Sequence, residues 1–225
     1  MTICHRTNSV ENPYVVETVA ESAVDGDAGN DNGQGDHLSE HLGPVFDFNN
    51  PPPPPHNGDQ WGDIIPPFDE NGNPRANTSL TLNWNAAGMA IFNNNCVPGN
   101  ATINVTKVVT GTGTPSASQV YSIHLTCTLD LGAGPVQVLD ETVNLTNGQT
   151  SADFEMQAGA VCTAVEDTTG LTNLASATNN GPVTLVAVGG SYTLTETNDF
   201  LLPAGNTPQS AGAAKPVAAS PALTG

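Results

Sequence analysis

YSIHLTCTL, residues 121–129, alternates strictly between apolar and polar side chains. Successive side chains of a strand point to opposite faces, so this period of two predicts a strand with one face in a core. Shorter stretches with the same period include Phe154 with Met156, and Tyr192 with Leu194. We therefore expect most of the chain around residues 100–200 to form a β-sheet domain.

Turn sequences separate these stretches. They are TGTGTP at 110–115, LGAGP at 131–135, TNGQ at 146–149 and TNNGP at 178–182. Several short strands with turns at this spacing predict an antiparallel β-sandwich of about 100 residues. Cys127 and Cys162 lie on strands that face the same core, and we expect them to form a disulfide.

The chain on either side has a different composition. Residues 1–99 predict a small irregular α+β module, which a Cys4–Cys96 disulfide would close. Residues 201–225 are rich in Ala and Pro and have no periodicity, which predicts a disordered tail. The module's expected features are a strand at 14–19, a helical turn at 37–42, a proline-rich insert at 51–55, and a helix over 85–95 with Asn85 as cap and Met89 and Phe92 on its apolar face.

Charge and cysteine content narrow the classes of function. The chain has 22 acidic and 4 basic residues and a net charge of −18, which disfavours binding to nucleic acid or to anionic membranes. No apolar run approaches the ~20 residues of a membrane span.

Four cysteines without a CxxC pair indicate two disulfides and an oxidising compartment. Because residues 1–10 lack the pattern of a signal peptide, we expect a mature piece of a longer exported protein, located outside the cell or on its surface.

One histidine-rich motif suggests metal chemistry. His37-Leu38-Ser39-Glu40-His41 matches HxxEH, but the glycines and proline around it exclude the long helix of a zinc peptidase. A structural or adventitious metal site could use His37 and His41 with His5 or Asp36. The alternative is that these side chains are exposed polar residues beside the Cys4–Cys96 disulfide. We expect no cofactor.

Acidic loops invite a calcium interpretation that their spacing does not support. Asp25, Asp27 and Asp31 lack the ligand order of an EF-hand, and the segment 69–73 is followed by Pro74 where glycine is needed. We favour solvated loops.

The N-terminal segments resemble a module of actinobacterial surface proteins. The resemblance rests on CHRTNSVENPYVVETVAESAV, HLSEHLGPVF, WGDIIPPF and LNWNAAGMAIFNNNCVPG, and it covers nearly all of residues 2–99. It implies an exported, wall-associated setting and no established activity. The last residues, PALTG, are similar to sortase signals, which suggests cell-wall attachment.

Residues 101–200 resemble the Cna-B-like (prealbumin-like) modules of Gram-positive surface proteins. INVTKVV, QAGAVCTAVEDTTG and SYTLTETNDF carry the resemblance, which is closest to a cysteine-containing actinobacterial variant of unknown function. Such modules often carry a Lys, a Glu and an Asn on a first, a middle and a last strand. The resemblance therefore implies an intramolecular isopeptide bond between Lys107 and Asn198, assisted by Glu166.

The same period of two places Lys107 and Asn198 on core faces of their strands. A lone buried ammonium is costly, so it must react or be paired. The alternative is a buried salt bridge, and Glu196, which shares the face of Asn198, could provide it.

Together these features predict a non-enzymatic structural or adhesin-like surface protein with the sandwich as a stalk module. A metal- or glycan-binding N-terminal module on a β-sandwich spacer is the alternative, with Trp61 and Trp84 available to stack on sugar. Any extracellular ligand stays unidentified by the sequence.

Overall fold

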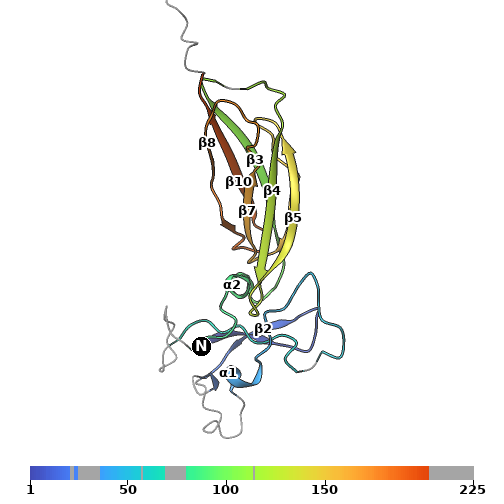
Figure 1. The fold of residues 1–225 in the computed structure, drawn as a ribbon. Coiled ribbons are helices and arrows are strands. Elements are labelled where there is room, and N and C mark those ends of the chain that lie inside the picture. Colours follow the sequence, from blue (N-terminus) through green and yellow to red (C-terminus); the bar gives the residue numbers. More distant parts are fainter. Residues whose placement is uncertain (21–22, 25–35, 57, 69–79, 114, 203–225) are drawn as a thin grey trace, which may run out of the picture.

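The computed structural model describes residues 1–20, 23–24, 36–56, 58–68, 80–113 and 115–202. It confirms a mainly β fold, with a small N-terminal module at one end of an elongated sandwich (Figure 1). The candidate calcium residues at 25–31 and 69–73, and the predicted tail beyond residue 202, lie outside the described residues.

The sandwich contains two four-stranded sheets that pack face to face. One sheet has the order β6-β3-β10-β8 and the other the order β5-β4-β7-β9. The predicted turns fall at strand ends: TNGQ lies between β5 and β6, LGAGP runs into the first residue of β5, and TNNGP runs from the last two residues of β8 to the residue before β9. The strands are β3 (Asn100–Gly111), β4 (Tyr121–Asp130), β5 (Pro135–Leu145), β6 (Phe154–Gln157), β7 (Val161–Glu166), β8 (Leu174–Asn179), β9 (Val183–Thr184) and β10 (Ser191–Phe200).

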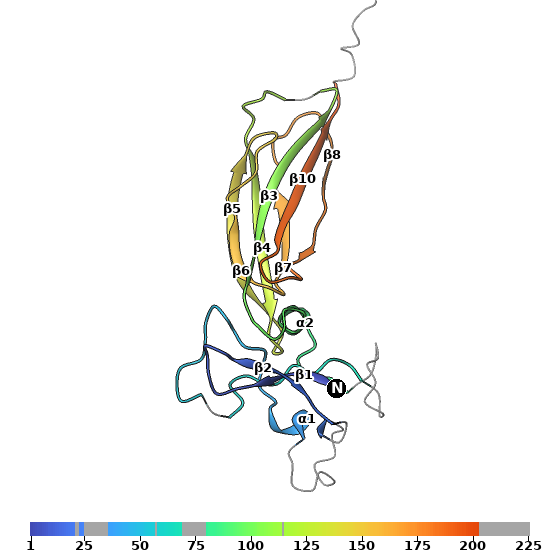
Figure 2. The same cartoon turned by 180° about the vertical axis from the view of Figure 1, so that it is seen from behind.

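The first and last strands of the sandwich lie side by side in the middle of one sheet. β10 pairs with β3 in parallel, from Ser191 opposite Thr102 to Phe200 opposite Gly111. This parallel pair departs from the purely antiparallel sandwich that the sequence predicts; the other strand ladders within the described residues are antiparallel. As a result the chain enters β3 beside the N-terminal module and leaves β10 at the far end (Figures 1 and 2).

Alternating burial explains why these segments form the sandwich. Tyr121, Ile123, Leu125, Cys127 and Leu129 of β4 are all buried, as the alternation predicts. The buried positions of β3 and β10 include charged and amide side chains, which form the site described below. β5 is an edge strand with mostly exposed side chains.

The N-terminal module is built on a two-stranded sheet and two short helices. The elements are β1 (Thr2–Arg6), β2 (Tyr14–Thr18), α1 (His37–Glu40) and α2 (Ala86–Asn93). β1 is a strand that we did not predict. Asn85 caps α2 through the Gly88 amide as predicted, but the expected apolar face is wrong. Met89 is 36% exposed, and the buried positions of α2 are Ala87, Gly88, Ala90 and Ile91.

The module and the sandwich share one continuous hydrophobic core. The buried Gln157 amide donates from Nε2 to the Phe46 carbonyl oxygen at 2.9 Å and accepts from the Phe48 amide at 2.7 Å. Gly159, with φ +102°, lies so close to α2 that an added Cβ would stand 2.3 Å from the Ala87 Cα. The boundary at residue 100 coincides with the start of β3, but independent folding of the two parts stays a prediction.

Both expected disulfides are present. Cys4 pairs with Cys96 across a sequence separation of 92, and Cys127 pairs with Cys162 across 35. The second bridge joins residues directly opposite each other on β4 and β7, and therefore lies within one sheet.

Candidate functional site

A buried cluster of charged and amide groups bridges the two sheets of the sandwich. Lys107 comes from β3 and Asn198 from β10, while Glu166 comes from β7 of the opposite sheet. Lys107 and Asn198 are fully buried, and the Glu166 side chain is 2% exposed. The three residues that the sequence predicts to react are therefore neighbours in the core.

The Glu166 carboxylate holds both prospective reactants. Its Oε2 accepts from Lys107 Nζ at 2.5 Å, and its Oε1 accepts from Asn198 Nδ2 at 2.7 Å. The amine and the carboxamide thus hydrogen-bond to the two oxygens of one side chain. Asn198 Oδ1 is buried and has no hydrogen-bond partner among the described residues, so it is free to accept a proton or a hydrogen bond.

Two further side chains surround the amine. Lys107 Nζ lies 4.6 Å from the centre of the Tyr121 ring, whose negative face attracts a cation. Burial raises the pKa of Tyr121, and the nearby Glu166 raises it further. Glu196 stands opposite Lys107 in the β3–β10 register and is 2% exposed. Burial raises the pKa of Glu196 to about 6, despite a hydrogen bond to Asn179 that lowers it.

Glu196 is not the ion-pair partner of the lysine. The salt bridge expected as the alternative to a covalent bond forms with Glu166 instead. A buried ion pair, an amide beside it and a second carboxyl group are unusual in a small core, because desolvation of each charge is costly. The arrangement is suited to proton transfer between neighbouring groups.

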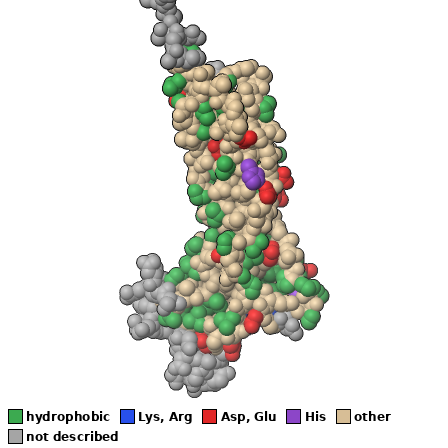
Figure 3. All heavy atoms as spheres, in the orientation of Figure 1, with side chains coloured by type: hydrophobic (Ala, Val, Ile, Leu, Met, Phe, Trp, Pro, Cys, Tyr) green, Lys and Arg blue, Asp and Glu red, His purple; other side chains and the backbone are tan. Residues whose placement is uncertain are grey.

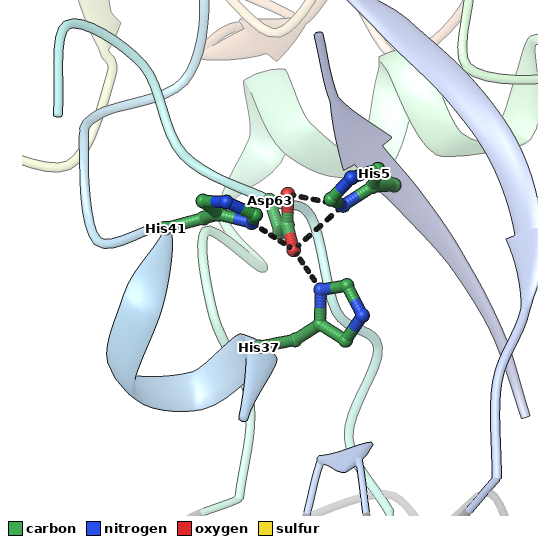
Figure 4. A group of neighbouring side chains, drawn as sticks. All are labelled: His5, His37, His41 and Asp63. Carbon is green, nitrogen blue, oxygen red and sulfur yellow. Dashed lines mark hydrogen bonds and ion pairs between the residues drawn. The ribbon is translucent and has the colours of Figure 1, made fainter. Parts of the chain in front are cut away.

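A second cluster lies in the N-terminal module, where three imidazoles surround one carboxylate (Figure 4). His37 begins α1, His41 follows it, and His5 comes from β1. The Nδ1 atoms of His37, His41 and His5 lie 2.6, 3.2 and 3.3 Å from Asp63 Oδ2. The structure therefore brings together all three predicted histidines.

The carboxylate of this cluster is Asp63 and not Asp36, which we predicted from the sequence. Asp36 caps α1, accepting from the Leu38 amide at 3.0 Å. Asp63 is fully buried between the apolar Trp61 and Ile64. The signal that could have found it is the single acidic residue inside WGDIIPPF, because an isolated buried carboxylate must be paired or bind a metal.

The backbone around Asp63 explains its position. The Arg6 amide donates to Asp63 Oδ1 at 2.7 Å, and the next residue, Ile64, exchanges two backbone hydrogen bonds with Cys4. Burial would raise the pKa of Asp63, but hydrogen bonds from His37, His5 and the Arg6 amide outweigh it and hold the pKa far below its usual value. The hydrogen bond with Asp63 in turn raises the pKa of His5.

The structure gives little support to the other sequence hypotheses for the module. α1 has one turn, and the Glu40 of HxxEH is exposed. Trp61 is fully buried and donates to the Pro13 carbonyl oxygen at 3.0 Å, so its ring cannot stack on a sugar. Trp84 packs on Phe92 with ring centres 5.1 Å apart.

Figure 3 shows acidic side chains scattered over one face of the molecule rather than gathered in one patch. Within the described residues, no helix is long and apolar enough to span a membrane.

The fold and the buried cluster define a two-sheet β-sandwich module with a disulfide inside one sheet and a buried Lys, Glu and Asn between the sheets. The chain belongs to the family described as "Domain of unknown function (DUF5979)", whose model matches residues 103–218. This match begins inside β3, so the resemblance of residues 2–99 to an actinobacterial module stays a prediction. A comparison with the sequences of curated proteins found no match.

Several solved structures resemble part of the chain at low identity. A pilus-presented adhesin matches 46% of this chain and 28% of its own length, with 14% identity and a TM-score of 0.30. The major pilin T3.2 of Streptococcus pyogenes matches 45% of both chains, with 12% identity and a TM-score of 0.33. An adhesin of Mobiluncus mulieris containing intramolecular disulfide, isopeptide and ester cross-links matches 44% of this chain and 40% of its own, with 20% identity and a TM-score of 0.29. This chain therefore spans less than half the length of these proteins.

Proposed function

We propose that this chain is a non-enzymatic structural module of an exported surface protein, and that its sandwich is a stalk element able to carry tension. The observation that supports the proposal is the contact of Glu166 with both Lys107 on the first strand and Asn198 on the last strand of the sandwich, in the buried core. In this proposal an isopeptide bond joins Lys107 to Asn198.

The three side chains can supply every proton and bond that the reaction requires. Glu166 takes a proton from the Lys107 ammonium, and the neutral Nζ attacks the Asn198 Cγ, whose oxygen takes up the negative charge. Glu166 then gives its proton to Nδ2 and accepts one from Nζ, which shuttles one proton between the two nitrogens. The Cγ–Nδ2 bond breaks, ammonia leaves, and the Nζ–Cγ amide remains. Exclusion of water from the core favours this outcome over hydrolysis of the carboxamide.

The topology makes this bond mechanically effective. Because β3 and β10 are parallel, a pull between the module and the far end of β10 shears these two strands past each other. A bond between Lys107 and Asn198 would carry that force and leave the intervening strands unloaded.

In the N-terminal module a disulfide could carry force past most of the residues in a comparable way. Force entering near residue 1 can pass through the Cys4–Cys96 disulfide and bypass the residues between them. It then reaches β3 after only a few residues. With the isopeptide bond in place, a continuous covalent path would cross both parts without unfolding either one.

An exported setting is consistent with the cysteines and the charge. All four cysteines are in disulfides, which persist in oxidising surroundings outside the cytoplasm. A net charge of −18 favours solubility and opposes association with other anionic surfaces. Attachment to the cell wall through PALTG is the finer part of this proposal.

Intact-mass measurement of the purified, folded chain tests the proposal. We expect a mass lower by one ammonia than the sequence mass after allowing for two disulfides, and the full mass in Glu166→Gln. Lys215→Ala is the matched control, because Lys215 is the chain's other lysine, and it should retain the loss of ammonia. After reduction, trypsin should fail to cleave at Lys107 in the wild type and cleave there in Glu166→Gln. An unmodified mass in folded wild-type protein would refute the bond.

A further inference from the structure

We propose that His5, His37, His41 and Asp63 bind one divalent transition-metal ion of the zinc type. One ligand atom from each residue lies within 4.8 Å of all the others. The site is separate from the lysine cluster, and the proposal does not depend on the isopeptide bond.

The spacing of the ligand atoms fits a tetrahedral ion. Bonds of about 2.0–2.1 Å to zinc place any two tetrahedral ligands about 3.3 Å apart. The distances from Asp63 Oδ2 to the three Nδ1 atoms are 2.6, 3.2 and 3.3 Å. The ring centres of the histidines are 4.9, 4.9 and 5.8 Å apart, so the imidazoles surround a common point without stacking. The three imidazoles approach the Asp63 carboxylate from different sides (Figure 4). Ligand atoms that lie up to 4.8 Å apart would draw together around a bound ion.

Hydrogen bonding alone does not account well for this arrangement. Asp63 Oδ2 faces three imidazole nitrogens, although one carboxylate oxygen has about two lone-pair directions. Asp63 Oδ1 is already engaged by the Arg6 amide. Three Nδ1 lone pairs directed at one cation, with a carboxylate as fourth ligand, satisfy every group at once.

The ligand types determine which ion is expected. Three imidazoles and one carboxylate suit zinc, cobalt, nickel and copper, whereas calcium and magnesium require mainly oxygen ligands. A divalent ion would also balance the buried Asp63 charge in a chain with few basic residues. Four protein ligands fill a tetrahedral shell, which is typical of a structural rather than a catalytic site.

The surroundings hold the ligands in place. Asp63 is oriented by the Arg6 amide, and its carbonyl oxygen accepts from Asn83 Nδ2 at 2.8 Å. Asp63 N also donates to the His41 carbonyl oxygen at 3.1 Å. Gly62 permits this approach, because a Cβ there would stand 2.2 Å from that oxygen. The ion would therefore tie β1, α1 and the segment around residue 63 together, beside the Cys4–Cys96 disulfide.

Titration of the full, disulfide-bonded chain tests the site directly. After chelator treatment and dialysis, we expect one equivalent of zinc to bind, with a higher melting temperature. Cobalt should give the intense visible absorption of a tetrahedral complex, and calcium at the same concentration should not compete. Long-range proton–nitrogen spectra should show zinc on Nδ1 of three histidines and protons on their Nε2 atoms.

Variants distinguish this site from weak binding at surface histidines. His37→Ala combined with His41→Ala should weaken zinc affinity by more than about 100-fold, since loss of outer-shell partners alone costs 10–100-fold. The control His124→Ala removes an exposed histidine that pairs with Asp140 at 2.5 Å, and it should not change the affinity. Absence of zinc and cobalt binding, an octahedral cobalt spectrum, or equal loss in His124→Ala would overturn the proposal. If the double variant misfolds, the cobalt and nitrogen spectra of the wild type still decide it.

Discussion

Glu166→Gln should convert an inextensible sandwich into an extensible one. The substitution keeps the size of the side chain and a hydrogen bond to Asn198, but it removes the base that takes the proton from Lys107. We therefore expect no isopeptide bond in this variant. The informative measurement is single-molecule extension, with the chain held beyond each of its ends under oxidising conditions.

The structure determines how much chain length the wild type and Glu166→Gln can each release when the sandwich unfolds. The folded distance from Asn100 to Phe200 is about 11 residues of strand at ~3.3 Å each, or about 36 Å. The chain makes 100 residue-to-residue steps from Asn100 to Phe200. Without the isopeptide bond, unfolding frees all of them except the 35 steps between Cys127 and Cys162, which the disulfide bypasses. The remaining 65 steps at ~3.4 Å extend to about 220 Å, a gain of about 190 Å. Reduction of that disulfide raises the sandwich's gain to about 300 Å by the same arithmetic.

The wild type should behave differently. An intact Lys107–Asn198 bond leaves only nine residue-to-residue steps free outside the loop, about 31 Å when extended. Together with the cross-link itself, this path is about as long as the folded sandwich, so almost no length can be released. No sandwich step is then expected at forces that unfold Glu166→Gln. Lys215→Ala should match the wild type. An oxidised wild-type chain that releases about 190 Å in one event would refute both the bond and the mechanical argument based on it.

Two other predictions concern the energetics of the fold. Burial raises the pKa of Glu196 from its ordinary 4.5 to about 6, so ionisation of this carboxyl group opposes folding. The free energy of unfolding of the wild type should therefore fall as the pH rises through 4.5–6, by about 2 kcal/mol in total. Denaturant titrations should show this loss in the exposed control Glu141→Gln and not in Glu196→Gln, and equal pH dependence of both variants would contradict the argument. Gly159→Ala should lower the melting temperature more than Gly134→Ala, because both have positive φ (+102° and +100°) but only Gly159 meets a neighbouring backbone. Similar melting temperatures for the two variants would show that the contact with α2 does not constrain the fold.

The sandwich could be predicted from sequence because its information is local. Alternation along residues 121–129 fixes which side chains face the core, and turn residues fix where the strands end. The parallel pairing of β3 with β10 could not be predicted in this way, since it joins residues about 90 positions apart and depends on how the sheets close. Even so, the period of two placed Lys107 and Asn198 correctly in the core.

The histidine cluster could be predicted from the sequence only in part. His37 and His41 are one helical turn apart, so local geometry suggests that they act together. His5 and Asp63 join them through the pairing of β1 with β2 and the bridge from Cys4 to Ile64, which no local pattern encodes. The sequence therefore supplied the histidines but named Asp36, which instead caps α1. β5 shows no clear alternation because it is an edge strand that buries little apolar surface. β1 was missed for another reason: Ile3 and Cys4 are adjacent and both buried, and the bridge from Cys4 to Ile64 depends on distant residues, so no alternating pattern marks the strand.

The two disulfides occupy different positions relative to the line of force, and reduction should separate their roles. Cys4–Cys96 lies on the path between the ends of the chain, whereas Cys127–Cys162 lies inside the loop that the Lys107–Asn198 bond would bypass. Reducing the wild type should therefore release the N-terminal module alone, by 92 steps at ~3.4 Å, or about 300 Å after subtracting the folded separation. Cys127→Ala with Cys162→Ala should leave the wild-type extension unchanged when Cys4–Cys96 is intact, although the folded state loses about 4 kcal/mol on the chain-entropy estimate. Extension of the sandwich in this oxidised double variant would show that force does not pass through Lys107 and Asn198.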